Sequence, residues 1–337
     1  MPMSIKDKYL GCLMGGAVCD ALGYPVEFNS YNQILARYGD GGISNYSLVN
    51  DTALISDDTQ MTLFTAEGLL MCGDDKLTSV YNCYREWAAM QIEGYPLPEP
   101  ISRLAKYSEL YESREPGRTC MLSLAHNERG SVAEPMNDSK GCGGIMRVAP
   151  IGLYYNITKT STAEISKIAA EAAALTHGHE LGYIPAAILG HMCAVLSQTD
   201  ATVADVLTDA VNTAKMLFGA TEHMKYMQNL IEKAVELSKV DLFDIDAITQ
   251  LGEGWVAEET LAIAVYCSLK YSDNFEKAIV ASVNHSGDSD STGAVTGNIM
   301  GAHLGMSAIP KKYTKNLELY DLIMNTADEL YHAAYDM

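Results

Sequence analysis

The sequence predicts an all-α fold built as one domain over residues 1–337. Apolar residues recur at three- and four-residue spacing along most of the chain, as they do on the buried face of a helix. Few runs alternate with a period of two, and valine and isoleucine are not concentrated in short bounded segments, so strands are not expected. The 337 residues include only 10 prolines, and no Pro/Gly/Ser-rich linker, low-complexity tract or internal repeat divides them.

The periodicity marks the expected elements in order along the chain. Helices are predicted over residues 5–22, 58–72, 77–91, 163–175, 181–197, 201–218, 220–239, 256–271, 273–283, 290–306 and 317–335. The longest irregular stretches, 23–56 and 110–150, are rich in Gly, Asn, Asp and Ser. We interpret both as loops that build a site rather than as domain boundaries.

The segment 290–306 is unusual because glycine recurs at every fourth position, which places these residues on one helical face. They are Gly293, Gly297, Gly301 and Gly305. An interior glycine costs about 1 kcal/mol relative to alanine, so close approach of a second backbone is expected in return. Gly11 and Gly15 offer a partner. A transmembrane dimer motif would show the same spacing, but Asn298 and His303 argue against it.

Composition restricts the partners and the compartment. The formal net charge of −20 disfavours nucleic acid and anionic lipid, which bind clustered Lys and Arg. The eight cysteines are scattered singly, so reduced core thiols are favoured over a zinc site or disulfides. The N-terminus lacks a signal-peptide pattern, and apolar segments such as 183–196 are short and contain Pro185 and His191, so no membrane span is expected. A cytoplasmic location fits these observations.

Two acidic clusters carry the strongest chemical signal: Ser56-Asp57-Asp58-Thr59 and Asp288-Ser289-Asp290-Ser291-Thr292, each at the start of a predicted helix. Either one alone is explained by helix capping, because Ser and Asp accept hydrogen bonds from unpaired amides at a helix N-terminus. Capping does not explain why each of two helix starts carries two carboxylates. Four carboxylates in one cavity would also repel each other. If the fold joins the clusters, they predict a two-metal site with the all-oxygen ligands that Mg²⁺ prefers.

Three further segments are rich in groups that could contact a ligand. Gly141, Cys142, Gly143 and Gly144 form a loop that could expose amides to a phosphate, or could be a structural turn. His177, Gly178 and His179 join two predicted helices, where a substrate-contacting loop is favoured over a zinc site because the H-E-x-x-H spacing is absent. Gly254 and Trp255 precede another helix, and the indole could stack on a base or pack in the core.

These segments, in this order, resemble the ADP-ribosylglycohydrolase family. The matching stretches are GCLMGGAVCDALGYPVEF at 11–28, SDDTQMTLFTAEGLL at 56–70, GCGGIMRVAPIGL at 141–153, THGHELGY at 176–183, GEGWVAEETLAIA at 252–264 and HSGDSDSTGAVTGNIMGAHLG at 285–305. The sequence is similar both to ADP-ribosylarginine hydrolases and to dinitrogenase-reductase-activating glycohydrolases. Serine at 56 and at 291, where other members carry threonine, favours the arginine hydrolases.

The resemblance implies an orthogonal helical bundle with a binuclear Mg²⁺ or Mn²⁺ centre in a cleft. It assigns the metal ligands to Ser56, Asp57, Asp58, Asp288, Asp290 and Ser291. The segments 141–144, 177–179 and 252–255 would surround the rest of ADP-ribose. Glu27 matches a glutamate that contacts the metal site in serine-specific members.

The expected activity is hydrolysis of the N-glycosidic bond between ADP-ribose and arginine on ADP-ribosylated proteins. Asp57 or Asp58 is the candidate for stabilising the oxocarbenium-like state and moving the proton, and Glu27 is a further catalytic candidate. Two alternatives remain: hydrolysis of serine-linked or free ADP-ribose derivatives, and non-catalytic binding of ADP-ribose. The intact carboxylates argue against the second alternative.

Overall fold

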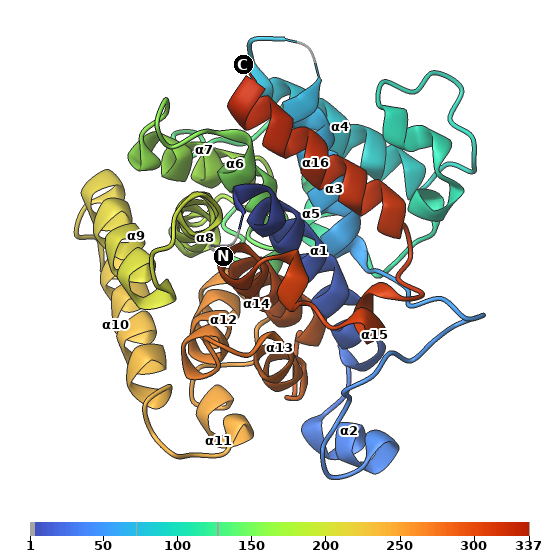
Figure 1. The fold of residues 1–337 in the computed structure, drawn as a ribbon. Coiled ribbons are helices and arrows are strands. Elements are labelled where there is room, and N and C mark those ends of the chain that lie inside the picture. The colour runs from blue at the N-terminus through green and yellow to red at the C-terminus, as the bar shows by residue number, and fades with distance from the viewer. Residues whose placement is uncertain (1–3, 72, 127, 337) are drawn as a thin grey trace.

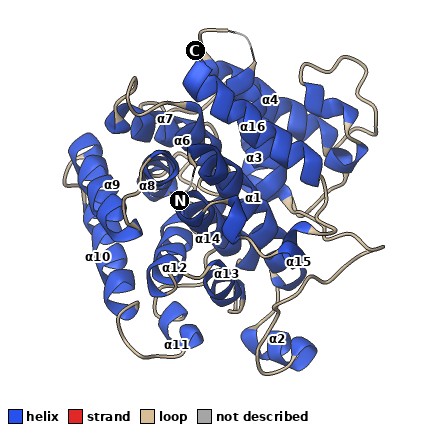
Figure 2. Ribbon diagram, viewed as in Figure 1, coloured by secondary structure: helices blue, strands red, loops and turns tan. Residues whose placement is uncertain are grey.

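The computed structural model describes residues 4–71, 73–126 and 128–336, and the all-α prediction is confirmed. Across these ranges the chain forms helices and loops, with isolated β-bridges but no strand (Figure 2). The helices predicted from periodicity are present, with ends shifted by up to three residues. They are α1 (Ile5–Gly23), α3 (Asp57–Leu70), α4 (Lys76–Met90), α7 (Thr162–Ala174), α8 (Glu180–Gln198), α9 (Val203–Phe218), α10 (Glu222–Leu237), α12 (Ala257–Lys270), α13 (Phe275–Val283), α14 (Ser289–Leu304) and α16 (Tyr320–Asp336).

Five short helices were not predicted, and two of them lie inside the stretches expected to be irregular. They are α2 (Tyr31–Tyr38), α5 (Arg118–Leu124), α6 (Ala149–Tyr154), α11 (Asp244–Ile248) and α15 (Lys311–Thr314). Each is too short to repeat an apolar pattern more than about twice. For α2 the sequence does contain a start signal, the capping-box pair Ser30 and Gln33. The Ser30 side chain accepts a hydrogen bond from the Gln33 backbone N–H, and the Gln33 side chain accepts one from the Ser30 backbone N–H.

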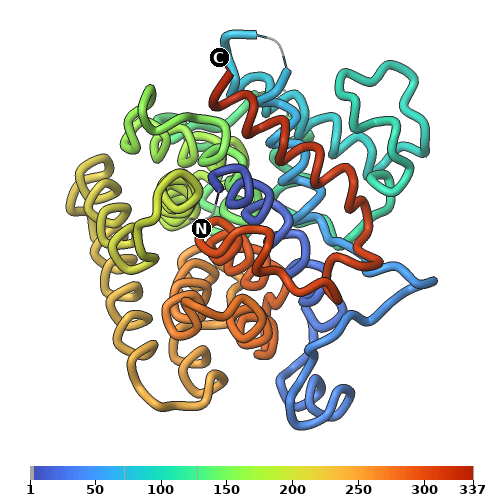
Figure 3. The backbone as a smooth tube through the Cα atoms, in the orientation of Figure 1, coloured from blue at the N-terminus to red at the C-terminus, as the bar shows by residue number. Residues whose placement is uncertain are grey.

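The predicted contact between the glycine-rich helix and the first helix is confirmed. Helices α1 and α14 lie side by side through the centre of the molecule, although they come from opposite ends of the chain (Figure 3). A Cβ on Gly301 would lie 1.9 Å from the carbonyl oxygen of Gly11, and one on Gly297 would lie 2.1 Å from that of Gly15. Because only glycine permits this approach, the spacing fixes how the first turn of α14 lies beside the end of α1.

The remaining helices surround this central pair. Helix α8 runs almost along the line of sight in Figure 1, whereas α10 and α16 lie across it, an arrangement of steeply crossing helices. Helices α9 and α10 cover one side, while α4 and α16 cover the opposite side (Figure 1). The buried apolar side chains form one continuous core, in agreement with a single domain.

Helix α8 is longer than the apolar segment 183–196 suggested. Its 19 residues pass a length and hydropathy test for a membrane span, but 89% of the tested window is buried inside the protein. A core helix passes the same test, so the finding is weak evidence for a membrane. Seven cysteines are free thiols in the described chain, as expected, while Cys72 lies outside the described residues.

Candidate metal and ADP-ribose site

The fold joins the two acidic clusters. Ser56 is the N-cap of α3 and Asp288 is the N-cap of α14, so the capping interpretation is correct for both. The Ser291 hydroxyl donates to Asp58 Oδ1 at 3.2 Å, a contact between residues 233 positions apart. Two helix N-termini therefore converge at one place, with their positive dipole ends directed at the same carboxylates.

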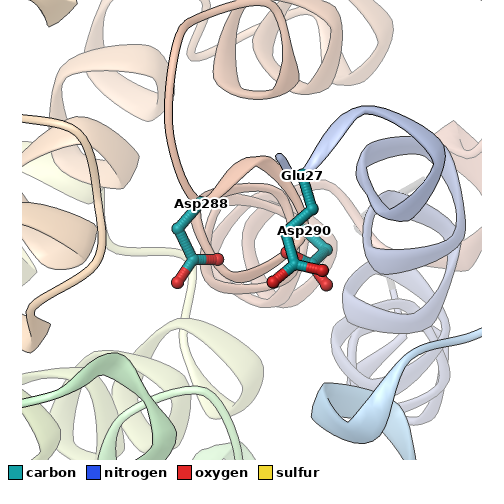
Figure 4. Close-up of side chains that lie close together, drawn as sticks. All are labelled: Glu27, Asp288 and Asp290. Atoms are coloured by element: carbon teal, nitrogen blue, oxygen red, sulfur yellow. The ribbon is translucent and has the colours of Figure 1, made fainter. Parts of the chain in front are cut away.

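Glu27 lies with this group. Its carboxylate and those of Asp288 and Asp290 offer oxygens that all lie within 4.8 Å of one another. In Figure 4 the three side chains point to the same side, the aspartates from the start of α14 and Glu27 from the loop after α1. The predicted proximity of Glu27 to the acidic clusters is therefore seen in the structure.

Burial and mutual repulsion make ionisation of these groups unfavourable. Burial, reinforced by the charges of Asp288 and Asp57, raises the pKa of Glu27 to about 9. Burial also raises the pKa of Asp57 to about 8, against the hydrogen bond from the Gly117 amide. The pKa values of Asp58 and Asp290 are raised well above the ordinary range by burial and by neighbouring carboxylates, and that of Asp288 is raised chiefly by burial.

The donor set fits a hard divalent cation. Glu27 Oε2 and Asp58 Oδ2 are buried and have no hydrogen-bond partner within the described chain, so the protein alone does not satisfy them. A cation would pair with these atoms and offset the repulsion among the carboxylates. One softer group is present as well: the Cys142 thiol donates to Asp288 Oδ2 at 2.8 Å.

Asp20 supports the first cluster and was missed in the sequence. It is fully buried in α1 and accepts hydrogen bonds from the Ser56 amide at 3.0 Å, from the Thr59 amide at 3.1 Å and from the Thr59 hydroxyl. Burial, partly offset by these bonds, raises the pKa of Asp20 to about 6. A lone acid inside the apolar stretch GGAVCDALG was the signal for it.

A hollow of about 340 Å³ opens beside the acidic clusters. The predicted site residues that line it are Glu27, Asp57, Asp58, Gly141, Cys142, Gly143, His177, Trp255, Asp288, Asp290 and Ser291. The remaining predicted residues do not line it: Ser56, Gly144, Gly178, His179 and Gly254. The loops around Gly141 and Trp255 are joined by the Cys142 amide, which donates to the Trp255 carbonyl at 3.2 Å.

The segment 177–179 divides between two environments. His177 is buried and lines the hollow, whereas Gly178 packs on the carbonyl of Asn137. His179 caps α8 by accepting from the Leu181 amide at 2.9 Å, and its ring lies 4.5 Å from that of His223. The structure therefore brings His177 to the hollow but gives His179 a capping position.

The mouth of the hollow carries an aromatic pair. Phe28 stacks on Trp255 with ring centroids 5.6 Å apart and planes 20° apart, and Phe28 is 65% exposed. Trp255 therefore faces the hollow rather than the core, as the ligand-contact interpretation requires. Phe28 was missed, because a single aromatic in a loop shows no pattern.

A larger groove of about 630 Å³ lies between α2, α11 and α13, away from the acidic clusters. Its acids are already paired with cations: Asp244 with Lys270 at 2.8 Å, and Glu276 with Lys312 at 2.6 Å. It lacks the unsatisfied carboxylates that distinguish the smaller hollow. We therefore place the candidate functional site in the smaller hollow.

Comparisons with known proteins find relatives along nearly the whole chain. The sequence profile of the ADP-ribosylglycohydrolase family matches residues 1–336. ADP-ribosylhydrolase ARH3 of Bos taurus is 27% identical over 93% of this chain and 89% of its own length. ADP-ribosyl-[dinitrogen reductase] glycohydrolase of Rhodospirillum rubrum is 23% identical over 94% and 92% of the two chains. A solved structure, an ADP-ribosylglycohydrolase-related protein complex, superimposes with a TM-score of 0.61 at 25% identity over 98% and 99%. The expected resemblance is confirmed, and the chain belongs to the ADP-ribosylglycohydrolase family.

Proposed function

We propose that this protein releases ADP-ribose from ADP-ribosylated arginine side chains of proteins by hydrolysing the N-glycosidic bond. The observation that carries the proposal is the hydrogen bond from Ser291 to Asp58, because it joins the two acidic clusters beside one hollow. The family relation supports hydrolysis of an ADP-ribosyl bond as the reaction. The free thiols of the described chain are compatible with a cytoplasmic place of action, which we include in the proposal.

An acid outside the metal cluster supports arginine as the residue released. Glu115 lines the hollow, is exposed to solvent and is not among the proposed metal ligands. Its carboxylate can attract a guanidinium ion and hold it by two parallel hydrogen bonds. Serine at positions 56 and 291 also agrees with the branch of the family that acts on arginine.

The residues of the two clusters would divide the chemistry among them. Ser56, Asp57, Asp58, Asp288, Asp290 and Ser291 would hold two Mg²⁺ or Mn²⁺ ions. Such ions supply positive charge to ribose hydroxyls and lower the pKa of a bound water. Asp57 or Asp58 would stabilise positive charge that develops on the ribose ring and accept a proton from the attacking water. Glu27 would take part in the same proton transfer, and its unpaired Oε2 supports this role.

Hydrolysis of a serine-linked ADP-ribose is the second candidate. Glu27 lies within 4.8 Å of Asp288 and Asp290, the arrangement that the resemblance associates with serine-specific members. Relatives named ADP-ribosylhydrolase ARH3 match this chain at 23–27% identity, and that name does not restrict the cleaved bond to arginine. The leaving oxygen of serine would need a proton, which a protonated Glu27 could supply.

A side-by-side release assay tests the proposal. Peptides carrying ADP-ribose on arginine or on serine are incubated with the protein in Mg²⁺, in Mn²⁺ or in chelator. We expect metal-dependent release from the arginine peptide, and none from the Asp57→Ala/Asp58→Ala double variant. The exposed loop variant Asp241→Asn is the control and should retain activity. Release from serine alone would favour the second candidate. Binding of ADP-ribose without release from either peptide would refute hydrolysis.

A further inference from the structure

Arg147 is a buried cation without a carboxylate partner in the described chain. Its guanidinium lies 4.3 Å from the centre of the Tyr84 ring, and Nη1 approaches the sulfur atoms of Met61 at 3.4 Å and Cys120 at 3.5 Å. Its side chain is fully buried, and Nε has no hydrogen-bond partner. Burying a charge among neutral groups costs free energy, so a function that depends on this charge is expected to offset the cost.

The strongest hydrogen bond of Arg147 leads to the wall of the hollow. Its Nη2 donates to the Thr176 hydroxyl at 2.6 Å, and the same hydroxyl lies 2.8 Å from Nδ1 of His177. A guanidinium can only donate, so Thr176 Oγ1 accepts there and has its own hydrogen free to donate. The competing acceptor is the sulfur of Cys120, which is a weak one. A second lone pair of Oγ1 is available to a protonated Nδ1, but the hydroxyl hydrogen would then be left to the weak sulfur acceptor. Donation to Nδ1 is therefore favoured, and Nδ1 then carries no proton.

The opposite nitrogen of His177 is the one that faces the ligand. Nε2 forms no hydrogen bond within the part of the chain that the structure describes, and His177 lines the hollow. The glycine loop stays close to this edge of the ring: a Cβ on Gly141 would lie 3.3 Å from Nε2, and one on Gly143 would lie 3.0 Å from Cε1. Only a small ligand group can approach Nε2 between the ring and the loop.

We propose that Arg147 and Thr176 are positioning residues that hold His177 as the Nε2–H tautomer, so that it donates a hydrogen bond to an anionic oxygen of the ligand. The ligand oxygen would belong to the diphosphate of ADP-ribose, and this part rests on the proposed function. The tautomer itself does not depend on the ligand, because it follows from which acceptor the Thr176 hydroxyl uses.

The electrostatics support a neutral donor backed by a fixed charge. Burial and the nearby Arg147 charge lower the pKa of His177 to about 3, so the imidazole stays neutral. A neutral ring cannot supply positive charge to a diphosphate, but Arg147 lies directly behind it and is screened little by water. The bonds from Arg147 to Thr176 and from Thr176 to His177 point in one direction, which strengthens the final N–H donor.

Nitrogen-15 NMR of the Mg²⁺-loaded protein, labelled on histidine, tests the tautomer directly. The His177 signals are assigned by their loss in a His177→Gln variant. We expect a protonated Nε2 and an unprotonated Nδ1 in the unaltered protein. A proton on Nδ1 would overturn the proposal, and this measurement requires no change at Thr176.

Paired substitutions at Thr176 test the relay. Thr176→Val removes the hydroxyl and should produce a mixture of tautomers, with ADP-ribose binding weakened roughly tenfold or more in calorimetry. Thr176→Ser keeps the hydroxyl and should restore both properties. An unchanged tautomer and unchanged affinity in Thr176→Val would refute the relay. If the unaltered protein has the expected tautomer but does not bind ADP-ribose, the proposed function fails rather than the relay.

Discussion

Replacement of Asp290 by Asn separates the role of the buried carboxylates in metal binding from their role in folding. The asparagine side chain keeps the shape of aspartate and the oxygen that accepts a hydrogen bond from the Ser291 backbone N–H at 3.1 Å. It removes one negative charge. Two unit charges 4.8 Å apart repel by about 3.5 kcal/mol at an effective dielectric constant of about 20. Asp290 has two such neighbours, Glu27 and Asp288, and without metal the cost is limited by protonation.

The order of stability of Asp290→Asn and the unaltered protein should therefore reverse when metal is added. In chelator we expect Asp290→Asn to be at least as stable as the unaltered protein, because a repulsive charge is gone. At a Mn²⁺ concentration about 100-fold above the dissociation constant, the unaltered protein gains about 2.7 kcal/mol. The variant should gain much less, because a ligand is lost.

Urea denaturation in chelator and in Mn²⁺ measures both differences. The exposed loop variant Asp241→Asn removes the same charge at a position that does not line the hollow, and it should respond to metal as the unaltered protein does. A stability difference between Asp290→Asn and the unaltered protein that is the same in chelator and in Mn²⁺ would refute the assignment of Asp290 as a metal ligand.

Three other substitutions test the scaffold of the site. Gly301→Ala places a Cβ 1.9 Å from the Gly11 carbonyl oxygen, where ordinary contact begins at 3.4 Å, so the free energy of unfolding in urea should fall by about 3 kcal/mol or more. The control Gly94→Ala has nothing within 4 Å of its Cβ and should leave that free energy unchanged. Equal losses in the two variants would contradict the packing argument. Cys142→Ala removes the donor to Asp288 and should weaken Mn²⁺ binding roughly tenfold in calorimetry, whereas Cys142→Ser should restore it; unaltered binding in the alanine variant would argue against an orienting role. Arg114→Ala removes the buried ion pair that the Arg114 guanidinium makes with the Glu318 carboxylate at 3.0 Å. The free energy of unfolding in urea should fall by about 3 kcal/mol, because Glu318 stays buried without a partner. A loss below about 1 kcal/mol would show that water replaces the guanidinium.

Most of the fold could be predicted because helical periodicity is local. The segments that became α9, α10 and α16 repeat their apolar positions on one face often enough to be recognised without knowledge of their partners. The short helices α5 and α15 could not, since their few residues are stabilised by tertiary contacts rather than by their own pattern. The glycine spacing of α14 was sufficient to predict its partner, because few other reasons explain Gly293, Gly297 and Gly301 on one face. Gly305 was wrongly included in that face, since it is the C-cap of α14 with φ of 75°.

The candidate site was predictable in its residues but less so in its arrangement. The repeated carboxylates identified Asp57, Asp58, Asp288 and Asp290, since capping alone does not explain them. The sequence could not separate His177, which reaches the hollow, from His179, which caps a helix, because both stand in the same short turn.

The sequence by itself determined the eleven longer helices of the described chain, the two acidic clusters and the resemblance to the family. Only the tertiary structure decided that Asp20 supports Ser56, and it placed Glu27, which the resemblance had suggested, within 4.8 Å of Asp288 and Asp290. The tertiary structure also placed the lone charge of Arg147 behind His177. The physical reason is range: helix formation and capping depend on residues a few positions apart, whereas a site of converging charges depends on which distant backbones can approach. Here that approach is set by the glycine contact between α1 and α14.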